Sequence, residues 1–263
     1  MDFIVCYMHG SAYGLLRSAR IVLIPTLFTN AMVAWVAVRH DFPSLGEWGS
    51  YAFIVATGLC FYLFGMWYND RVDAEWDRVH RPDKPVPQGQ VSVKALSNAC
   101  ILVLVLGYLF CRIQFYHSSP WFASFFIFFL PALIFLYHWM HKKRPEAVVI
   151  MGLCRGVWVM AAGVFALCAV QKGGEINLLS PKLFLLEWYA ASLCVYTTIA
   201  SCVARGESAS AKRKKWAGIL LSFMCFHDMA WLAILTRAWE MPVFALACYG
   251  ISQGLKRIGQ SDS

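Results

Sequence analysis

Charge-poor stretches recur along the whole chain, and each is long enough to span the roughly 30 Å hydrocarbon core of a bilayer. We identify eight of them, at about 21–38, 50–69, 92–111, 119–139, 147–169, 183–204, 215–236 and 239–255. One such stretch cannot be told from a buried helix, but eight within 263 residues can. With 59% hydrophobic and 14% charged residues, the chain is predicted to be an all-α, polytopic transmembrane helical bundle. The composition shows no break, so we expect a single domain over 1–263.

The distribution of basic residues predicts how this bundle is oriented. If the N-terminus is cytoplasmic, 17 of the 23 Lys and Arg residues fall in cytoplasmic segments, five fall outside, and Arg155 lies within a span. Such a bias is typical of cytoplasmic loops. We therefore expect an integral membrane protein of a bacterial inner membrane, with both termini cytoplasmic. The net charge of +8 is explained by topology and by attraction to anionic membrane lipid, and no nucleic-acid partner is expected.

The segment 69–89 contains the clearest candidate functional site in the sequence. It follows the second apolar stretch directly and is rich in charged residues. Asn69, Asp73 and Asp77 are spaced four apart, so on a helix they share one face, and His80 falls on the same face. The residues expected on the opposite side are Arg71, Glu75 and Arg78.

A column of amide and carboxylate oxygens at a membrane edge is suited to Mg²⁺, which binds carboxylates and leaves positions open for substrate phosphates. The stretch after it is basic and rich in proline, and supplies positive charge beside the column. The alternative is a solvated, salt-bridged loop that only marks the membrane edge. That alternative explains neither the spacing on one face nor the asparagine.

The pattern N-D-x-x-D-x-x-x-D, followed by R-P-x-K-P-x-P-x-G, resembles the first aspartate-rich motif of the UbiA superfamily of intramembrane prenyltransferases. The resemblance implies that Asn69, Asp73 and Asp77 are ligands of Mg²⁺ on a prenyl diphosphate, with Asp73 and Asp77 acting in catalysis. Asp70 would lie alongside, and Arg81 and Lys84 would bind the phosphates. It extends more loosely over the whole chain, through the order of the spans.

Further substrate-binding residues are expected where other spans end. The resemblance includes the basic connection after the fourth span, where we count Lys143 as substrate-binding. At the end of the sixth span, typical members carry a second aspartate-rich motif, whereas residues 196–208 contain no Asp. Ser201 and Arg205 share a face there, and a guanidinium can pair with a diphosphate directly in place of a metal ion. Equally, Arg205 can be the first charge of a cytoplasmic loop.

The missing second motif and the count of eight spans, where familiar members have nine, set this chain apart from the typical pattern. Cys154-Arg155-Gly156 and the sequence from Ser201 to Glu207 are similar to a divergent branch, the EboC-type members. The loss of half of a metal site bears on catalysis more than on diphosphate binding.

Polar residues within spans have two possible roles, because charge in hydrocarbon is costly and usually faces a bundle interior. Arg155 is predicted to bind the diphosphate or a motif carboxylate, or else to pair structurally with a buried acid. His227 and Asp228 either line an acceptor pocket or bond a neighbouring helix, and the structural role is favoured. Asn30 either lines the cavity or satisfies backbone freed by Pro25.

Together these features predict a Mg²⁺-dependent prenyltransferase that moves an isoprenoid chain from a prenyl diphosphate to a small lipophilic acceptor. The alternative is a non-catalytic carrier of a prenyl diphosphate, a lipid or a metabolite, working in a biosynthetic or export assembly. The missing second motif is what keeps this alternative open.

Overall fold

The computed structural model describes residues 12–114, 120–141, 144–169, 181–205, 211–236 and 240–261. The elements are η1 (Ile21–Leu23), α2 (Pro25–Arg39), α3 (Trp48–Val72), α4 (Ala74–His80), α5 (Val93–Gln114), α6 (Pro120–Met140), α7 (Ala147–Cys168), α8 (Pro181–Arg205), α9 (Ala211–Leu235) and α10 (Glu240–Ser261). The described part of the chain contains helices and no strands. Because hydrocarbon offers no hydrogen-bond partners, an apolar span must satisfy its backbone internally, as a helix does.

The predicted transmembrane bundle is confirmed, and its helices fall within a few residues of the expected spans. Over the described residues, five helices are long and apolar enough to cross a membrane: Ile21–Arg39, Trp48–Val72, Val93–Ile113, Ala147–Cys168 and Leu183–Ala204. Three shorter apolar helices are Phe128–Met140, Ile219–Leu235 and Val243–Leu255. With these, the helices account for all eight stretches that the sequence predicted.

Helix α2 forms the centre of the bundle. Every side chain from 32 to 38 has no exposed surface, and α2 contacts α3, α7, α8, α9 and α10. A helix that is buried on all sides must be surrounded by other helices. The neighbouring helices pack as the pairs α3 with α5, α7 with α8, and α9 with α10.

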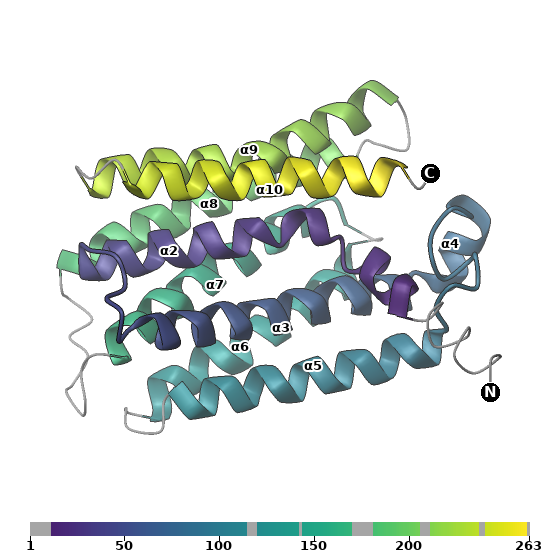
Figure 1. The fold of residues 1–263 in the computed structure, drawn as a ribbon. Coiled ribbons are helices and arrows are strands. Elements are labelled where there is room, and N and C mark those ends of the chain that lie inside the picture. Colours follow the sequence, from purple (N-terminus) through teal and green to yellow (C-terminus); the bar gives the residue numbers. More distant parts are fainter. Residues whose placement is uncertain are drawn as a thin grey trace.

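The long helices alternate in direction, so α3, α6, α8 and α10 end on the same side of the bundle (Figure 1). The short helix α4 lies at that end, beyond the last turn of α3 (Figure 1). Helices α5, α7 and α9 begin there. The fold therefore brings the segment 69–89 to the same end of the molecule as Arg205, the last residue of α8.

Candidate functional site

Three carboxylates are buried where α3 gives way to α4. Asp70, Asp73 and Asp77 expose only 4%, 8% and 1% of their surface. The helical hydrogen bonds continue across the junction, from the Asp73 amide to the Asn69 carbonyl at 2.9 Å and from the Asp77 amide to the Asp73 carbonyl at 2.8 Å. The i to i+4 spacing is therefore kept, and the acids stay on one side although α3 formally ends at Val72.

Lys84 reaches two of these carboxylates. Its Nζ lies 3.1 Å from Oδ1 of Asp70 and 2.8 Å from Oδ2 of Asp77. Asp70 and Asp77 are seven residues apart, close to two helical turns, so they lie on one side of the helix, and Lys84 contacts both from the loop after α4. Contact with opposite charge is what makes burial of a carboxylate tolerable.

The loop that carries Lys84 is folded back by its own backbone and by Arg17. The Gln88 amide donates to the Lys84 carbonyl at 3.1 Å, and Arg17 donates to the Gln88 side chain at 2.9 Å. Gly89 has a φ of 72°, in the left-handed region where glycine carries no steric penalty. The position of Lys84 is therefore set by a defined turn.

Helix α6 supplies a further contact on the acidic group. His141 follows the last residue of α6, and its Nε2 lies 3.4 Å from Oδ1 of Asp73. Its Nδ1 lies 3.0 Å from the His138 carbonyl. The ring of His138 packs edge-on against Tyr68 of α3. The sequence pattern did not place His141 near Asp73, because no local spacing connects α6 with α4.

Of the other residues predicted for this segment, Asn69 is partly buried and the rest are exposed. The predicted position of His80 on the same face is wrong, since its ring is exposed and stacks on Trp76 at 4.2 Å. Helix α4 ends at His80, and stacking on an aromatic ring one turn back draws the imidazole away from the acids. Arg81 is also exposed and lies 5.5 Å from the centre of the Trp76 ring. The residues expected on the opposite side are all exposed: Arg71, Glu75 and Arg78.

The donor types fit a divalent cation, although their arrangement in this structure is closed around a lysine. Three carboxylates lie almost out of solvent, and Lys84 contacts two of them. Oδ1 of Asp77 is buried and, within the described residues, has no hydrogen-bond partner. Over the same residues, however, no group of three His, Cys, Asp or Glu side chains is arranged to hold a metal ion. Asp70 and Asp77 converge on the Lys84 ammonium.

The other predicted substrate-binding residues are only partly described. Lys143 lies outside the described residues. Arg205 is placed as the end of α8, while its side chain is not described. Ser201 is partly buried one turn earlier, and Thr197, a further turn back, is buried.

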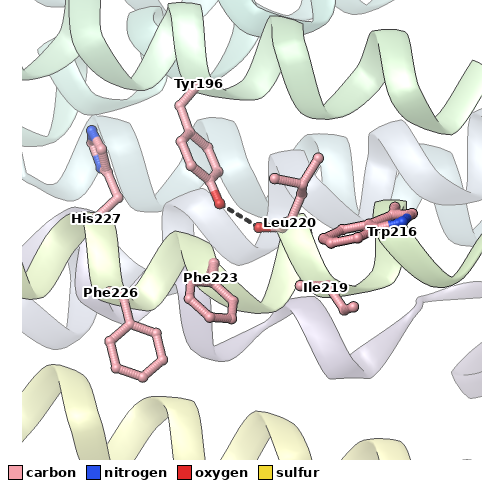
Figure 2. Close-up of a pocket in the computed structure, with 7 residues that line it drawn as sticks. All are labelled: Tyr196, Trp216, Ile219, Leu220, Phe223, Phe226 and His227. Atoms are coloured by element: carbon pink, nitrogen blue, oxygen red, sulfur yellow. Dashed lines mark hydrogen bonds between the residues drawn. The ribbon is translucent and has the colours of Figure 1, made fainter. Parts of the chain in front are cut away.

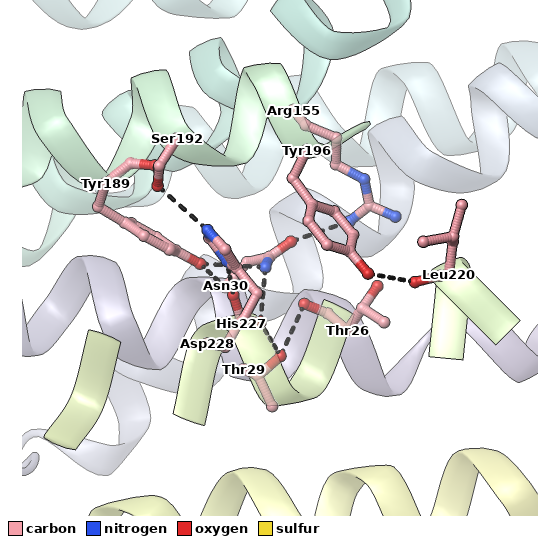
Figure 3. A network of polar contacts seen from close by, with 10 residues as sticks. All are labelled: Thr26, Thr29, Asn30, Arg155, Tyr189, Ser192, Tyr196, Leu220, His227 and Asp228. Atoms are coloured by element: carbon pink, nitrogen blue, oxygen red, sulfur yellow. Dashed lines mark hydrogen bonds and ion pairs between the residues drawn. The ribbon is translucent and has the colours of Figure 1, made fainter. Parts of the chain in front are cut away.

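A buried polar network joins α2, α7, α8 and α9 in the interior, and it includes the polar span residues that the sequence singled out, Asn30, Arg155, His227 and Asp228 (Figure 3). Asp228 of α9 is fully buried and accepts hydrogen bonds from Thr29, from Asn30 at 2.8 Å and from Tyr189 at 2.8 Å. Arg155 of α7 donates to Oδ1 of Asn30 at 3.0 Å. These contacts favour the structural role for Arg155 and Asp228, while Asn30, among the described residues, bonds the side chains of other helices and not the backbone near Pro25. No local pattern in the sequence pointed to Thr29 and Tyr189 as partners of Asp228, because the three residues lie in different helices.

His227 lies between this network and an apolar groove on α8 and α9. Its Nδ1 lies 3.3 Å from Asp228 and its Nε2 lies 3.1 Å from Oγ of Ser192. Figure 2 shows the groove, of about 470 Å³, and the side chains that line it. They are Tyr196, Trp216, Ile219, Leu220, Phe223, Phe226 and His227. The groove lies on helices other than those that carry the acids.

Comparisons with known proteins point to one family. The model of the UbiA prenyltransferase family matches residues 22–261. Among solved structures, the chain is similar to a UbiA homologue from Archaeoglobus fulgidus bound to DMAPP and Mg²⁺, with 16% sequence identity and a TM-score of 0.48. That match covers 94% of this chain and 87% of the other. A comparison with curated proteins gave no match.

The buried network generates a prediction about stability. Asp228→Ala leaves the donors of Thr29, Asn30 and Tyr189 without their acceptor. It also removes the carboxylate to which Arg155 is linked through Asn30. We expect the free energy of unfolding to fall by about 3 kcal/mol or more, because each buried donor left without an acceptor costs about 1–3 kcal/mol.

The measurement is thermal denaturation of the purified protein in detergent. Asp83→Ala, in an exposed loop position, is the matched control and should change stability by no more than about 0.5 kcal/mol. Equal stability of the two variants would show that the network does not hold the helices together.

Proposed function

The chain belongs to the UbiA prenyltransferase family, and from this we propose that it is an integral-membrane prenyltransferase. It transfers an isoprenoid chain from a prenyl diphosphate to a small lipophilic acceptor and uses Mg²⁺. The observation that carries this proposal is the burial of three carboxylates at one end of an apolar helical bundle. A polar headgroup can bind at that end while an apolar chain lies among the helices or in lipid.

We assign the roles at the site to residues of this chain. Asn69, Asp73 and Asp77 hold the metal ion, and Asp70 lies beside them. Bound Mg²⁺ would neutralise negative charge on the diphosphate. The burial of the carboxylates and the unbonded oxygen of Asp77 support this assignment, because Mg²⁺ prefers carboxylate oxygens.

Basic residues from three connections complete the proposed diphosphate site. Lys84 and Arg81 come from the loop after α4, Lys143 from the connection after α6, and Arg205 from the end of α8, with Ser201 one turn before it. Each presents donors to phosphate oxygens, and arginine does so through a planar fork. The allylic C–O bond breaks with its electron pair going to the diphosphate, and cationic donors stabilise the charge that develops there. The acceptor attacks the allyl cation that remains, and it loses a proton to water or to the released diphosphate as the new bond forms.

Arg155 lies deeper than this site. Its guanidinium carbon is 5.9 Å from the centre of the Tyr62 ring, and Tyr62 and Asn69 lie on one side of α3, seven residues apart. Seven residues correspond to about 10 Å along a helix. We therefore propose that any contact of Arg155 with substrate is made below the metal-binding residues, and that its bond to Asn30 gives it a structural role as well.

The test is binding and turnover of allylic prenyl diphosphates, from C10 to C20 and longer, by protein in lipid nanodiscs with Mg²⁺. Asp73→Ala is expected to abolish product, and Asp77→Asn to weaken diphosphate binding by about tenfold or more, equivalent to about 1.4 kcal/mol. Glu75→Gln is the matched control, because Glu75 lies between the two acids in sequence and is exposed on the other side of α4.

The outcomes separate the two candidate functions. Product formation supports the transferase. Binding without product, over a broad panel of acceptors, supports the carrier. The absence of Asp from 196–208 is the sequence feature behind the carrier alternative. If wild type binds no prenyl diphosphate, the transferase and a carrier of prenyl diphosphate both fail. Full activity after replacement of both Asp73 and Asp77 by Asn would show that the site lies elsewhere.

We further propose that the protein lies in a bacterial inner membrane with the α4 end of the bundle in the cytoplasm. The bias of Lys and Arg toward the segments at this end supports that orientation. A fluorescent protein fused after Ser263 should therefore mature and fluoresce, and alkaline phosphatase fused there should be inactive. The opposite pair of results would reverse the topology.

A further inference from the structure

Lys84 lies between Asp77, a proposed ligand of the metal ion, and Asp70, which lies beside the proposed ligands. We propose that this lysine holds the place of the cation, so that Mg²⁺ and the diphosphate bind together and the metal ion alone binds poorly. The inference rests on the proposed function and adds an order of binding to it. Its residues are Lys84, Asp70 and Asp77.

The distances make lysine and metal competitors. The ammonium lies 3.1 Å from Asp70 and 2.8 Å from Asp77, and only 16% of the Lys84 side chain is exposed. A Mg²⁺ ion bound by the same oxygens would lie at about 2.0–2.1 Å from each of them. The two cations cannot occupy that space at once.

A metal ion bound instead to Oδ1 of Asp77 meets the same obstacle. That oxygen has no hydrogen-bond partner among the described residues, but it belongs to the carboxylate whose Oδ2 contacts Lys84. A dication and an ammonium group would then share one buried carboxylate. Their repulsion is weakly screened in such a place, so Lys84 must leave or gain an anion of its own.

The folded loop favours binding of Lys84 to these carboxylates over binding of a metal ion from solution. The Gln88 amide donates to the Lys84 carbonyl at 3.1 Å, and Arg17 holds Gln88 and Gln90 through their side-chain oxygens. A group tethered in this way has a high effective concentration at its partner. Mg²⁺ that binds without a diphosphate displaces Lys84 and supplies no new anion for its ammonium group.

A diphosphate changes this balance because it brings oxygens that accept from an ammonium group. Lys84 can then exchange Asp70 and Asp77 for phosphate while the metal ion takes the carboxylates. Metal and diphosphate therefore strengthen each other's binding, and by thermodynamic linkage they do so by the same factor. Lys84 is the residue through which this coupling acts.

The experiment titrates the purified protein with Mn²⁺, followed by electron paramagnetic resonance, with and without inorganic pyrophosphate. A protein-free sample corrects for the manganese–pyrophosphate complex. In wild type, pyrophosphate should tighten Mn²⁺ binding by about tenfold or more. In Lys84→Met, Mn²⁺ alone should bind about tenfold or more tighter than in wild type, and the coupling should fall below about threefold.

Two variants serve as controls. Lys84→Arg keeps a cation that can contact both carboxylates and should retain the coupling. Lys94→Met removes an exposed lysine from α5 and should titrate like wild type. If Lys84→Met fails to fold, the wild-type titration still tests the inference, because Mn²⁺ binding that pyrophosphate leaves unchanged would overturn it.

The inference is overturned if wild type binds Mn²⁺ as tightly without pyrophosphate as with it, or if Lys84→Met keeps the full coupling. A distinct result is the absence of Mn²⁺ binding in every variant and condition. That result would remove the metal site of the proposed function, and the order of binding with it.

Discussion

The burial of negative charge at one end of an apolar bundle is the constraint on which the rest of this site depends. Asp70, Asp73 and Asp77 expose 8% of their surface or less, at the point where a membrane-spanning helix ends. Carboxylates in such a place must contact cations or accept hydrogen bonds, because desolvation of an unpaired charge costs several kcal/mol or more. Lys84 and His141 meet part of that requirement, and a divalent cation with its phosphate is the partner that we propose for the remainder.

The interior of the bundle solves a similar problem in a different way. Asp228 is fully buried, yet its carboxylate accepts hydrogen bonds from three neutral side chains, and Arg155 is joined to it through Asn30. One buried acid is thus satisfied within the protein and ties α2, α7, α8 and α9 together. Unlike the group at α4, it leaves no acidic oxygen for an outside ligand.

The sequence predicted the features that depend on residues close together in the chain. Apolar length set the eight helices, and the four-residue spacing put Asp73 and Asp77 on a buried side of the chain, opposite the exposed Arg71 and Glu75. It did not predict contacts between distant segments, such as His141 with Asp73, or Tyr189 with Asp228. Those contacts depend on how the helices pack, and no periodicity records that. The position of His80 was missed because stacking on Trp76 outweighed its place on the helical wheel.

The most direct test of the account is to locate the metal ion. Crystals grown with Mn²⁺ and a non-reactive prenyl diphosphate analogue would show manganese by its anomalous scattering. We expect a peak at about 2.2 Å from carboxylate oxygens of Asp73 and Asp77, with the Lys84 ammonium moved from Asp70 and Asp77 to the diphosphate. A diphosphate bound elsewhere, or bound beside these acids with no metal peak and Lys84 still between Asp70 and Asp77, would contradict it.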